Sequence, residues 1–343
     1  MRASSDTASE TASETASDTA SETASDAAPD TGLPRRIDVR EVGPRDGLQN
    51  ERPIPTEAKL DIVRHLVAAG ARRIEATSFV SPRAVPALAD AADVAAALTQ
   101  WPHVRWSALV AGVRGAERAV AAGITDVEYV VSAADGHSRA NVGRTTREAL
   151  DLVPRVADIV HEAGGNLEVI IATAWDCPFD GETPADRVRE IVDSALRDGA
   201  DEICLADTIG TVTPGRLLSL LHETRRVAPG LDVAVHLHNT RGTGLASAYA
   251  ALLAGVTRLD ASIGGLGGCP FAPGASGNIA TEELVYLAHD LGIETGLDLE
   301  GLLAAARRAE ELLGAALPSG LLRAGDRLRP PAGGGELACA AQR

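Results

Sequence analysis

Residues 167–172 read LEVIIA, residues 184–198 read PADRVREIVDSALRD, and residues 202–206 read EICLA. The two apolar runs have the length and β-branched composition of buried strands, whereas the segment between them carries apolar residues at helical spacing. A strand, a helix and a second strand in this order form a parallel pair with a right-handed crossover. This stretch therefore predicts an α/β fold.

The same unit recurs between residues 37 and 300. Six more strands are expected at Ile37–Val42, Arg73–Thr77, Val104–Val110, Val127–Val131, Val233–Leu237 and Arg258–Ser262. Further helices are expected at Glu57–Ala69, Thr146–Glu162 and Pro214–Val227. Eight strands fit one closed (β/α)8 TIM barrel, which usually occupies about 250 residues. A doubly wound open sheet gives a similar rhythm and is the alternative.

The two ends of the chain differ from this region. From Asp6 to Asp30 an acidic residue recurs at every fourth position, which predicts a disordered acidic low-complexity tail over residues 1–34. Residues 329–343 are rich in Pro, Gly and Ala, so Cys339 is expected in a flexible C-terminal tail. The expected TIM-barrel domain is residues 35–328, with a short C-terminal helical extension.

Composition limits the class of partner and the compartment. The formal net charge of −16 argues against nucleic acid and membrane surfaces as partners, because both are polyanionic. The four cysteines show no C-x-x-C spacing, and no apolar run is long enough to span a bilayer. We therefore expect a cytoplasmic protein whose partner is a small molecule.

Charged and imidazole side chains follow several expected strands at their carboxyl ends, where barrels build active sites. They are Arg45 and Asp46 after the first strand, Glu75 near the end of the second, Asp207 after the sixth, and His236 and His238 at the seventh. Random placement would scatter such residues over both ends. We expect these side chains to meet at one rim.

A metal site is the first chemical interpretation of this rim. His236 and His238 are two residues apart on a strand, so both point to one face and can hold one ion. Two partly buried histidines that satisfy backbone groups are the alternative. Asp46 would add a carboxylate and Asn278 a carbonyl oxygen. Such mixed ligands suit Mg²⁺, Mn²⁺ or Co²⁺ and leave positions for a substrate.

Arg45 and Cys269 supply further chemistry. Arg45 is either part of a surface ion pair with Asp46 or reaches an oxyanion at the barrel mouth. Cys269 lies in a glycine-rich run, residues 264–278, which predicts a mobile loop with a reactive thiol able to exchange a proton with an enolate. The only lysine, Lys59, is expected on an outer helix, outside the barrel mouth. If the protein cleaves carbon–carbon bonds, a metal rather than a Schiff-base lysine must therefore be the electron sink.

Six stretches resemble the hydroxymethylglutaryl-CoA lyase family, part of a larger group of metal-dependent lyases and condensing enzymes. They are residues 41–51 (EVGPRDGLQNE), 74–82 (IEATSFVSP), 207–210 (DTIG), 236–238 (HLH), 265–270 (GLGGCP) and 274–278 (GASGN). The resemblance runs in order over residues 37 to 300. It implies a TIM-barrel enzyme that cleaves 3-hydroxy-3-methylglutaryl-CoA to acetyl-CoA and acetoacetate by a metal-assisted retro-Claisen reaction, in leucine catabolism and with a homodimer possible.

The resemblance also implies roles for individual residues. The metal ligands would be Asp46, His236, His238 and Asn278, with Mg²⁺ or Mn²⁺ expected. Arg45 would stabilise the enolate of the departing acetyl-CoA, Cys269 would carry a proton, and His236 is a candidate for the base at the substrate hydroxyl. Residues that would position substrate or ligands are Gln49, Glu75 and Asp207.

Two positions depart from the family pattern. Asn239 and Arg241 stand where related lyases usually carry Asp and Tyr. The change suggests a related 3-hydroxyacyl-CoA, such as a branched 3-hydroxyglutaryl-CoA or citramalyl-CoA, as an alternative substrate. A condensing enzyme of the same superfamily is a second alternative, although those enzymes generally carry further C-terminal domains and lack the glycine–cysteine loop. A non-catalytic acyl-CoA-binding module is the third.

Overall fold

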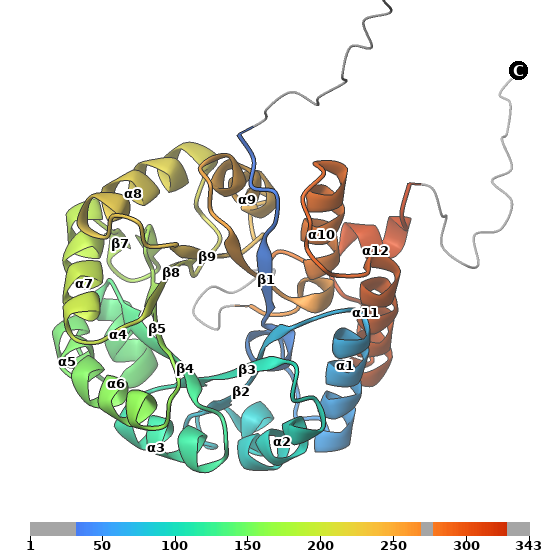
Figure 1. Ribbon diagram of the computed structural model, residues 1–343, viewed down its shortest axis with the longest axis horizontal. Coiled ribbons are helices and arrows are strands. Elements are labelled where there is room, and N and C mark those ends of the chain that lie inside the picture. The colour runs from blue at the N-terminus through green and yellow to red at the C-terminus, as the bar shows by residue number, and fades with distance from the viewer. Residues whose placement is uncertain (1–31, 269–276, 328–343) are drawn as a thin grey trace, which may run out of the picture. The chain divides into compact units, whose positions relative to one another are not determined.

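The structure, a computed structural model, describes residues 32–268 and 277–327. In this part of the chain eight parallel strands close into a barrel in the order β1-β10-β9-β8-β5-β4-β3-β2. Helices surround the ring of strands (Figure 1). Because β1 pairs with both β2 and β10, the sheet has no edge. The predicted TIM barrel is confirmed, and the open sheet is excluded.

Every barrel strand overlaps a strand expected from the sequence. The barrel strands are β1 (Asp38–Glu41), β2 (Arg73–Phe79), β3 (Arg105–Val110), β4 (Asp126–Ser132), β5 (Leu167–Ala172), β8 (Glu202–Asp207), β9 (Ala234–Leu237) and β10 (Arg258–Ala261). A separate two-stranded hairpin consists of β6 (Asp176–Cys177) and β7 (Gly181–Glu182). Val, Leu and Ile are frequent in the barrel strands, which are covered on both faces.

The helices follow the strands in alternation. They are α1 (Thr56–Ala68), α2 (Ala91–Ala97), α3 (Val113–Ala121), α4 (Asp135–Val142), α5 (Thr146–Leu150), α6 (Val153–Glu162), α7 (Ala185–Arg197), α8 (Pro214–Val227), α9 (Gly244–Leu253), α10 (Thr281–Asp290), α11 (Leu299–Leu313) and α12 (Gly320–Ala324). Short helical turns are η1 (Gly43–Gly47), η2 (Pro86–Leu88), η3 (Leu98–Gln100) and η4 (Ile263–Gly265). None of the helices in the described residues is long and apolar enough to cross a membrane.

One predicted helix is wrong. The pattern over residues 146–162 predicts a single helix, but the structure breaks it into α5 and α6. Pro154 lies in the first turn of α6, where its missing N–H leaves no hydrogen bond unmade. The helix is therefore broken just before this proline, which the prediction from apolar spacing alone did not take into account.

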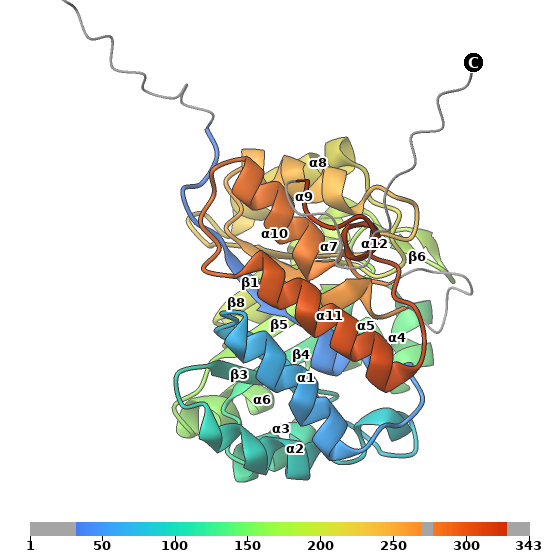
Figure 2. The ribbon, with the colours of Figure 1, turned by 90° about the vertical axis from the view of Figure 1, so that its right-hand side faces the viewer.

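The expected C-terminal helical extension is confirmed. Helix α11 packs against α1, and the short α12 packs against α10 and α11. Figure 2 shows α11 running beside α1 on the outside of the barrel. Lys59 lies on α1, where its Nζ donates to the carbonyl oxygen of Ala87 at 2.6 Å and pairs with Asp90. The lysine is therefore outside the barrel mouth, as expected.

The barrel interior has an apolar layer and an ionic layer. Small apolar side chains from neighbouring strands form the first, namely Val130, Ile170, Cys204, Ala206 and Ala234. The ionic layer centres on Arg40 of β1, which contacts carboxylates from β4, β5 and β10. An ionic interior of this kind is stable only when every charge has partners.

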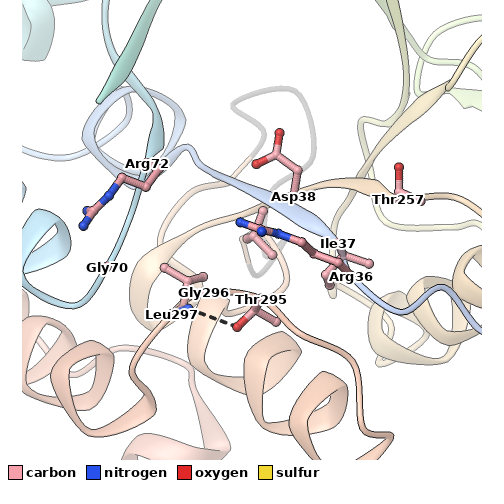
Figure 3. A pocket seen from close by; sticks show the side chains of 10 residues that line it. Arg36, Ile37, Asp38, Gly70, Arg72, Thr257, Thr295, Gly296 and Leu297 are labelled. Carbon is pink, nitrogen blue, oxygen red and sulfur yellow. Dashed lines mark hydrogen bonds between the residues drawn. The ribbon is translucent and has the colours of Figure 1, made fainter. Parts of the chain in front are cut away.

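One cavity among the described residues lies at the amino ends of the strands. It has a volume of about 590 Å³ and opens beside Asp38 at the start of β1, with Arg72 just before β2 and Thr257 just before β10. In Figure 3, the side chain of Arg36 extends between those of Asp38 and Thr295, and the side chain of Arg72 points away from them. Because barrel enzymes act at the other end of the strands, this cavity is separate from the site described next.

Candidate active site

A single π-helical turn directly after β1 carries Arg45 and Asp46, both buried. Glu41, the last residue of β1, connects this turn to the segment after β10 by hydrogen bonds. One of its carboxylate oxygens accepts from the N–H groups of Gly43 and Ile263, each at 2.8 Å. A Cβ on Gly43 would lie 2.6 Å from that oxygen, so only glycine fits here. The hydroxyl of Thr281 binds the other oxygen at 2.6 Å.

Replacing Glu41 should separate the effect of its shape from the effect of its charge. We expect Glu41→Ala to destabilise the protein by about 3 kcal/mol or more, because two buried N–H groups and a hydroxyl lose their partner. Glu41→Gln keeps the shape and a carbonyl acceptor, so it should cost under about 1 kcal/mol near neutral pH. Urea unfolding of the two variants measures the difference, and equal losses would contradict this account.

The same carboxyl predicts a dependence of stability on pH. Burial raises the pKa of Glu41 from its ordinary value of 4.5 to about 7, against the opposing hydrogen bond from Thr281. A folded-state pKa above the unfolded value gives stability that is complete below pH 4.5 and is lost as the pH rises through 7. Urea unfolding of wild type and Glu41→Gln at several pH values should therefore show a steeper loss in wild type over this range.

The three strongest candidate ligands meet at the carboxyl ends of β1 and β9. Nitrogen Nε2 of His236 lies 3.1 Å from Nε2 of His238. The Oδ2 atom of Asp46 is 3.9 Å from the first nitrogen and 3.8 Å from the second. These three groups are the one cluster of potential metal ligands found in residues 32–268 and 277–327, and their ligand atoms all lie within 4.8 Å of one another.

Two amide side chains complete the surroundings of Asp46. Asn278 donates from Nδ2 to Asp46 Oδ2 at 2.7 Å, and Gln49 donates to Oδ1 at 2.6 Å. Within the described residues, the carbonyl oxygen of Asn278 is buried without a hydrogen-bond partner. A buried acceptor of this kind, beside a carboxylate and two imidazoles, fits a divalent ion that prefers oxygen and nitrogen ligands.

Arg45 lies beside the cluster in a buried ion pair. Its Nη1 donates to Asp46 Oδ1 at 2.7 Å, and its Nε lies 2.7 Å from Oε1 of Glu75 on β2. Burial raises the pKa of Glu75 well above its usual range, in spite of the nearby guanidinium. Burial would likewise raise the pKa of Asp46, but Arg45 and the two histidines hold it well below its ordinary value. Arg45 is therefore a buried cation at the barrel mouth, and the surface ion pair is excluded.

A family model described as HMGL-like matches residues 36–308. The hydroxymethylglutaryl-CoA lyase YngG of Bacillus subtilis is 40% identical over 83% of this chain and 96% of that protein. The protein belongs to the HMGL-like family. The (R)-citramalyl-CoA lyase of Chloroflexus aurantiacus is 43% identical over 84% of this chain and 95% of that protein. An HMG-CoA lyase from Acinetobacter baumannii, solved with coenzyme A and 3-methylmalate, matches with a TM-score of 0.82 at 38% identity, covering 88% of this chain and 99% of that one.

Among the other residues expected at this HMGL-like site, Asp207 lies outside the ligand cluster. Its carboxylate accepts from the N–H groups of Thr211 and Val212 at 2.9 and 3.0 Å. Burial raises the pKa of Asp207, while these two backbone hydrogen bonds lower it. Asp207 therefore shapes the loop after β8. Cys269 lies outside the described residues, as do Cys339 and most of both expected tails.

The two departures from the family pattern have structural roles. Asn239 accepts from the N–H of Gly244 at 3.1 Å, at the start of α9. Arg241 donates to the carbonyl oxygens of Ile209 and Gly210 at 2.7 and 3.1 Å, which ties the loop after β9 to the loop after β8. Both side chains thus act on the loops that frame the barrel mouth.

Several polar residues near the mouth were not predicted. Ser132, at the end of β4, lies 2.9 Å from both the Nδ1 of His137 and the hydroxyl of Thr173. Thr173 follows β5 and has a φ of 54°, rare for a residue other than glycine. Glu41 and Asp260 were also missed. For these two residues the sequence did offer a signal, because each is a charged residue within an expected buried strand.

Proposed function

We propose that this protein cleaves 3-hydroxy-3-methylglutaryl-CoA to acetyl-CoA and acetoacetate. The observation that carries the proposal is the meeting of Asp46, His236 and His238 beside the buried Arg45 at the barrel mouth. A carbon–carbon lyase needs both a cation at the hydroxy acid and a cation at the forming enolate. The hydroxymethylglutaryl-CoA lyase of Bacillus subtilis, at 40% identity, supports the substrate.

The reaction makes separate demands on the two ends of the substrate. Loss of the proton from the tertiary hydroxyl lets its electrons form the ketone of acetoacetate as the bond between the second and third carbons breaks. The electrons of that bond pass to the thioester as an enolate. Arg45 is positioned to stabilise this negative charge, and a proton then returns to the second carbon to give acetyl-CoA.

The ion is proposed to be Mg²⁺ or Mn²⁺, held by Asp46, His236, His238 and the carbonyl oxygen of Asn278. When bound, such an ion would supply positive charge at the hydroxyl and carboxylate end of the substrate. Nitrogen Nε2 of His236 cannot hold the ion and accept a proton at the same time. We therefore assign His236 to the ion; it would act as a base only when it does not hold the ion.

Cys269 is proposed as the proton carrier at the second carbon, on the strength of the family motif. We expect Cys269→Ala to lower kcat by about 100-fold, the lower end of the range for general acid–base catalysis, and to leave Mn²⁺ affinity unchanged. Steady-state kinetics and a Mn²⁺ titration of the same preparation measure both. A variant with wild-type kcat would remove this role.

A second substrate, citramalyl-CoA, is favoured by the 43% identity to a citramalyl-CoA lyase. Compared with 3-hydroxy-3-methylglutaryl-CoA, citramalyl-CoA lacks one methylene between the reacting carbon and the carboxylate. Its cleavage products are acetyl-CoA and pyruvate. An enzyme usually discriminates between substrates that differ by one methylene by only about 1–3 kcal/mol. Small changes at the barrel mouth can therefore decide which of the two thioesters is preferred. Arg241, which joins the loops after β8 and β9, is one place where such a change can act.

The test uses metal-stripped protein with each thioester, with and without Mg²⁺ or Mn²⁺, and mass spectrometry of the products. Metal-dependent release of acetyl-CoA with acetoacetate supports the proposed function. Release of pyruvate from citramalyl-CoA at a much higher kcat/KM would replace the substrate. No cleavage of either thioester by metal-loaded protein would overturn the lyase proposal and favour a binding module or a condensing enzyme.

A further inference from the structure

A buried carboxylate lies behind His236, on the side of the ring away from His238. Oxygen Oδ2 of Asp260 on β10 is 3.1 Å from Nδ1 of His236, and both residues are buried. The two residues are direct partners in the pairing of β9 with β10. The backbone hydrogen bonds of the barrel therefore help to set this contact. The other ring nitrogen, Nε2, faces His238 and Asp46.

Arg40 on β1 holds the same carboxylate with two hydrogen bonds. Its Nε donates to Asp260 Oδ1 and its Nη2 donates to Oδ2, each at 2.8 Å. The remaining nitrogen of the guanidinium contacts Glu128 and Glu168. A carboxylate in a bidentate pair with a guanidinium is ionised and can only accept hydrogen bonds. Nδ1 of His236 must therefore be the donor.

We propose that Asp260, braced by Arg40, is a positioning residue that fixes His236 as its Nδ1–H tautomer and keeps the lone pair of Nε2 toward the metal site. The inference rests on the metal site of the proposed function. Within the described residues His238 has no equivalent brace, because its Nδ1 is buried without a hydrogen-bond partner. Asp260 therefore orients His236, whereas Nδ1 of His238 has no such carboxylate behind it.

The expected consequence is a change in metal affinity. A carboxylate behind a ligating imidazole orients the ring and makes its free nitrogen more basic, and losing such a partner usually weakens metal binding by about 10–100-fold. Asp260→Asn offers one acceptor oxygen where two stood, so Arg40 and His236 compete for it. We expect Mn²⁺ binding by Asp260→Asn to weaken by about 10–100-fold, measured by electron paramagnetic resonance of free Mn²⁺.

Glu168→Gln is the matched control. Glu168 is equally buried and also pairs with Arg40, but its other partner is Arg258 and it does not contact His236. This variant disturbs the ionic layer to a similar degree and should keep nearly wild-type Mn²⁺ affinity. Equal weakening in both variants would show a general structural effect and overturn the proposal.

A second measurement needs no change at Asp260. In metal-free wild-type protein with ¹⁵N-labelled histidine, nuclear magnetic resonance should show His236 as the Nδ1–H tautomer, with its signal identified by loss in His236→Asn. A dominant Nε2–H tautomer would overturn the proposal even if Asp260→Asn does not fold. Neither measurement uses a thioester, so failure of the proposed substrate would leave this inference standing.

Discussion

Replacing Arg45 with glutamine is expected to lower kcat for thioester cleavage by up to about 1,000-fold, the upper range for loss of one preorganised oxyanion partner. The guanidinium is buried and its Nη1 and Nε lie 2.7 Å from Asp46 and Glu75, so it is held in place before substrate arrives. Glutamine retains hydrogen-bonding capacity without the charge. The loss therefore reports on the charge that meets the forming enolate.

Two controls make the result on Arg45 specific. Mn²⁺ affinity of Arg45→Gln should remain measurable, because none of the three clustered ligand atoms is removed. Burial raises the pKa of Glu75, which favours its uncharged form once the guanidinium is removed and so lowers the cost of leaving it without a cation. The melting temperature should then fall only modestly. A kcat within about threefold of wild type would contradict the proposed role, since an oxyanion partner is worth far more.

The sequence predicts the barrel well because strand and helix periodicity are local properties. Each of the eight strands lies within about two residues of its expected position. The meeting of Asp46, His236 and His238 was predictable for a related reason, since residues after parallel strands meet at one rim. His236 and His238 share a face because side chains alternate along β9.

The ionic layer could not be predicted because its partners are far apart in the chain. Arg40 and Asp260 are separated by 220 positions and meet only because the barrel closes between β1 and β10. The alternation of side chains along a strand places both residues inside the barrel. It does not show which of the interior charged residues contact one another. The role of Asn239 was missed for a different reason, because its contact with Gly244 depends on how the chain turns into α9.

Asp46→Asn is expected to weaken Mn²⁺ binding by more than about 100-fold, because even the loss of an outer partner of a ligand costs about 10–100-fold. The carboxylate is the only anionic group among the three clustered ligands, and hard divalent ions depend on such charge. Cleavage of 3-hydroxy-3-methylglutaryl-CoA should fall to near background at Mn²⁺ concentrations that saturate wild type. Mn²⁺ titration followed by electron paramagnetic resonance, with kinetics on the same samples, measures both effects.

Glu75→Gln is the matched control for Asp46→Asn. Both changes replace a buried carboxyl that contacts Arg45 by its isosteric amide, but Glu75 is outside the ligand cluster. Because Glu75 supplies none of the three clustered atoms, Mn²⁺ affinity should stay close to that of wild type. If the two variants lost affinity equally, the charge around Arg45 rather than direct ligation would account for metal binding. A selective loss in Asp46→Asn would instead identify Asp46, in the turn after β1, as a metal ligand beside His236 and His238.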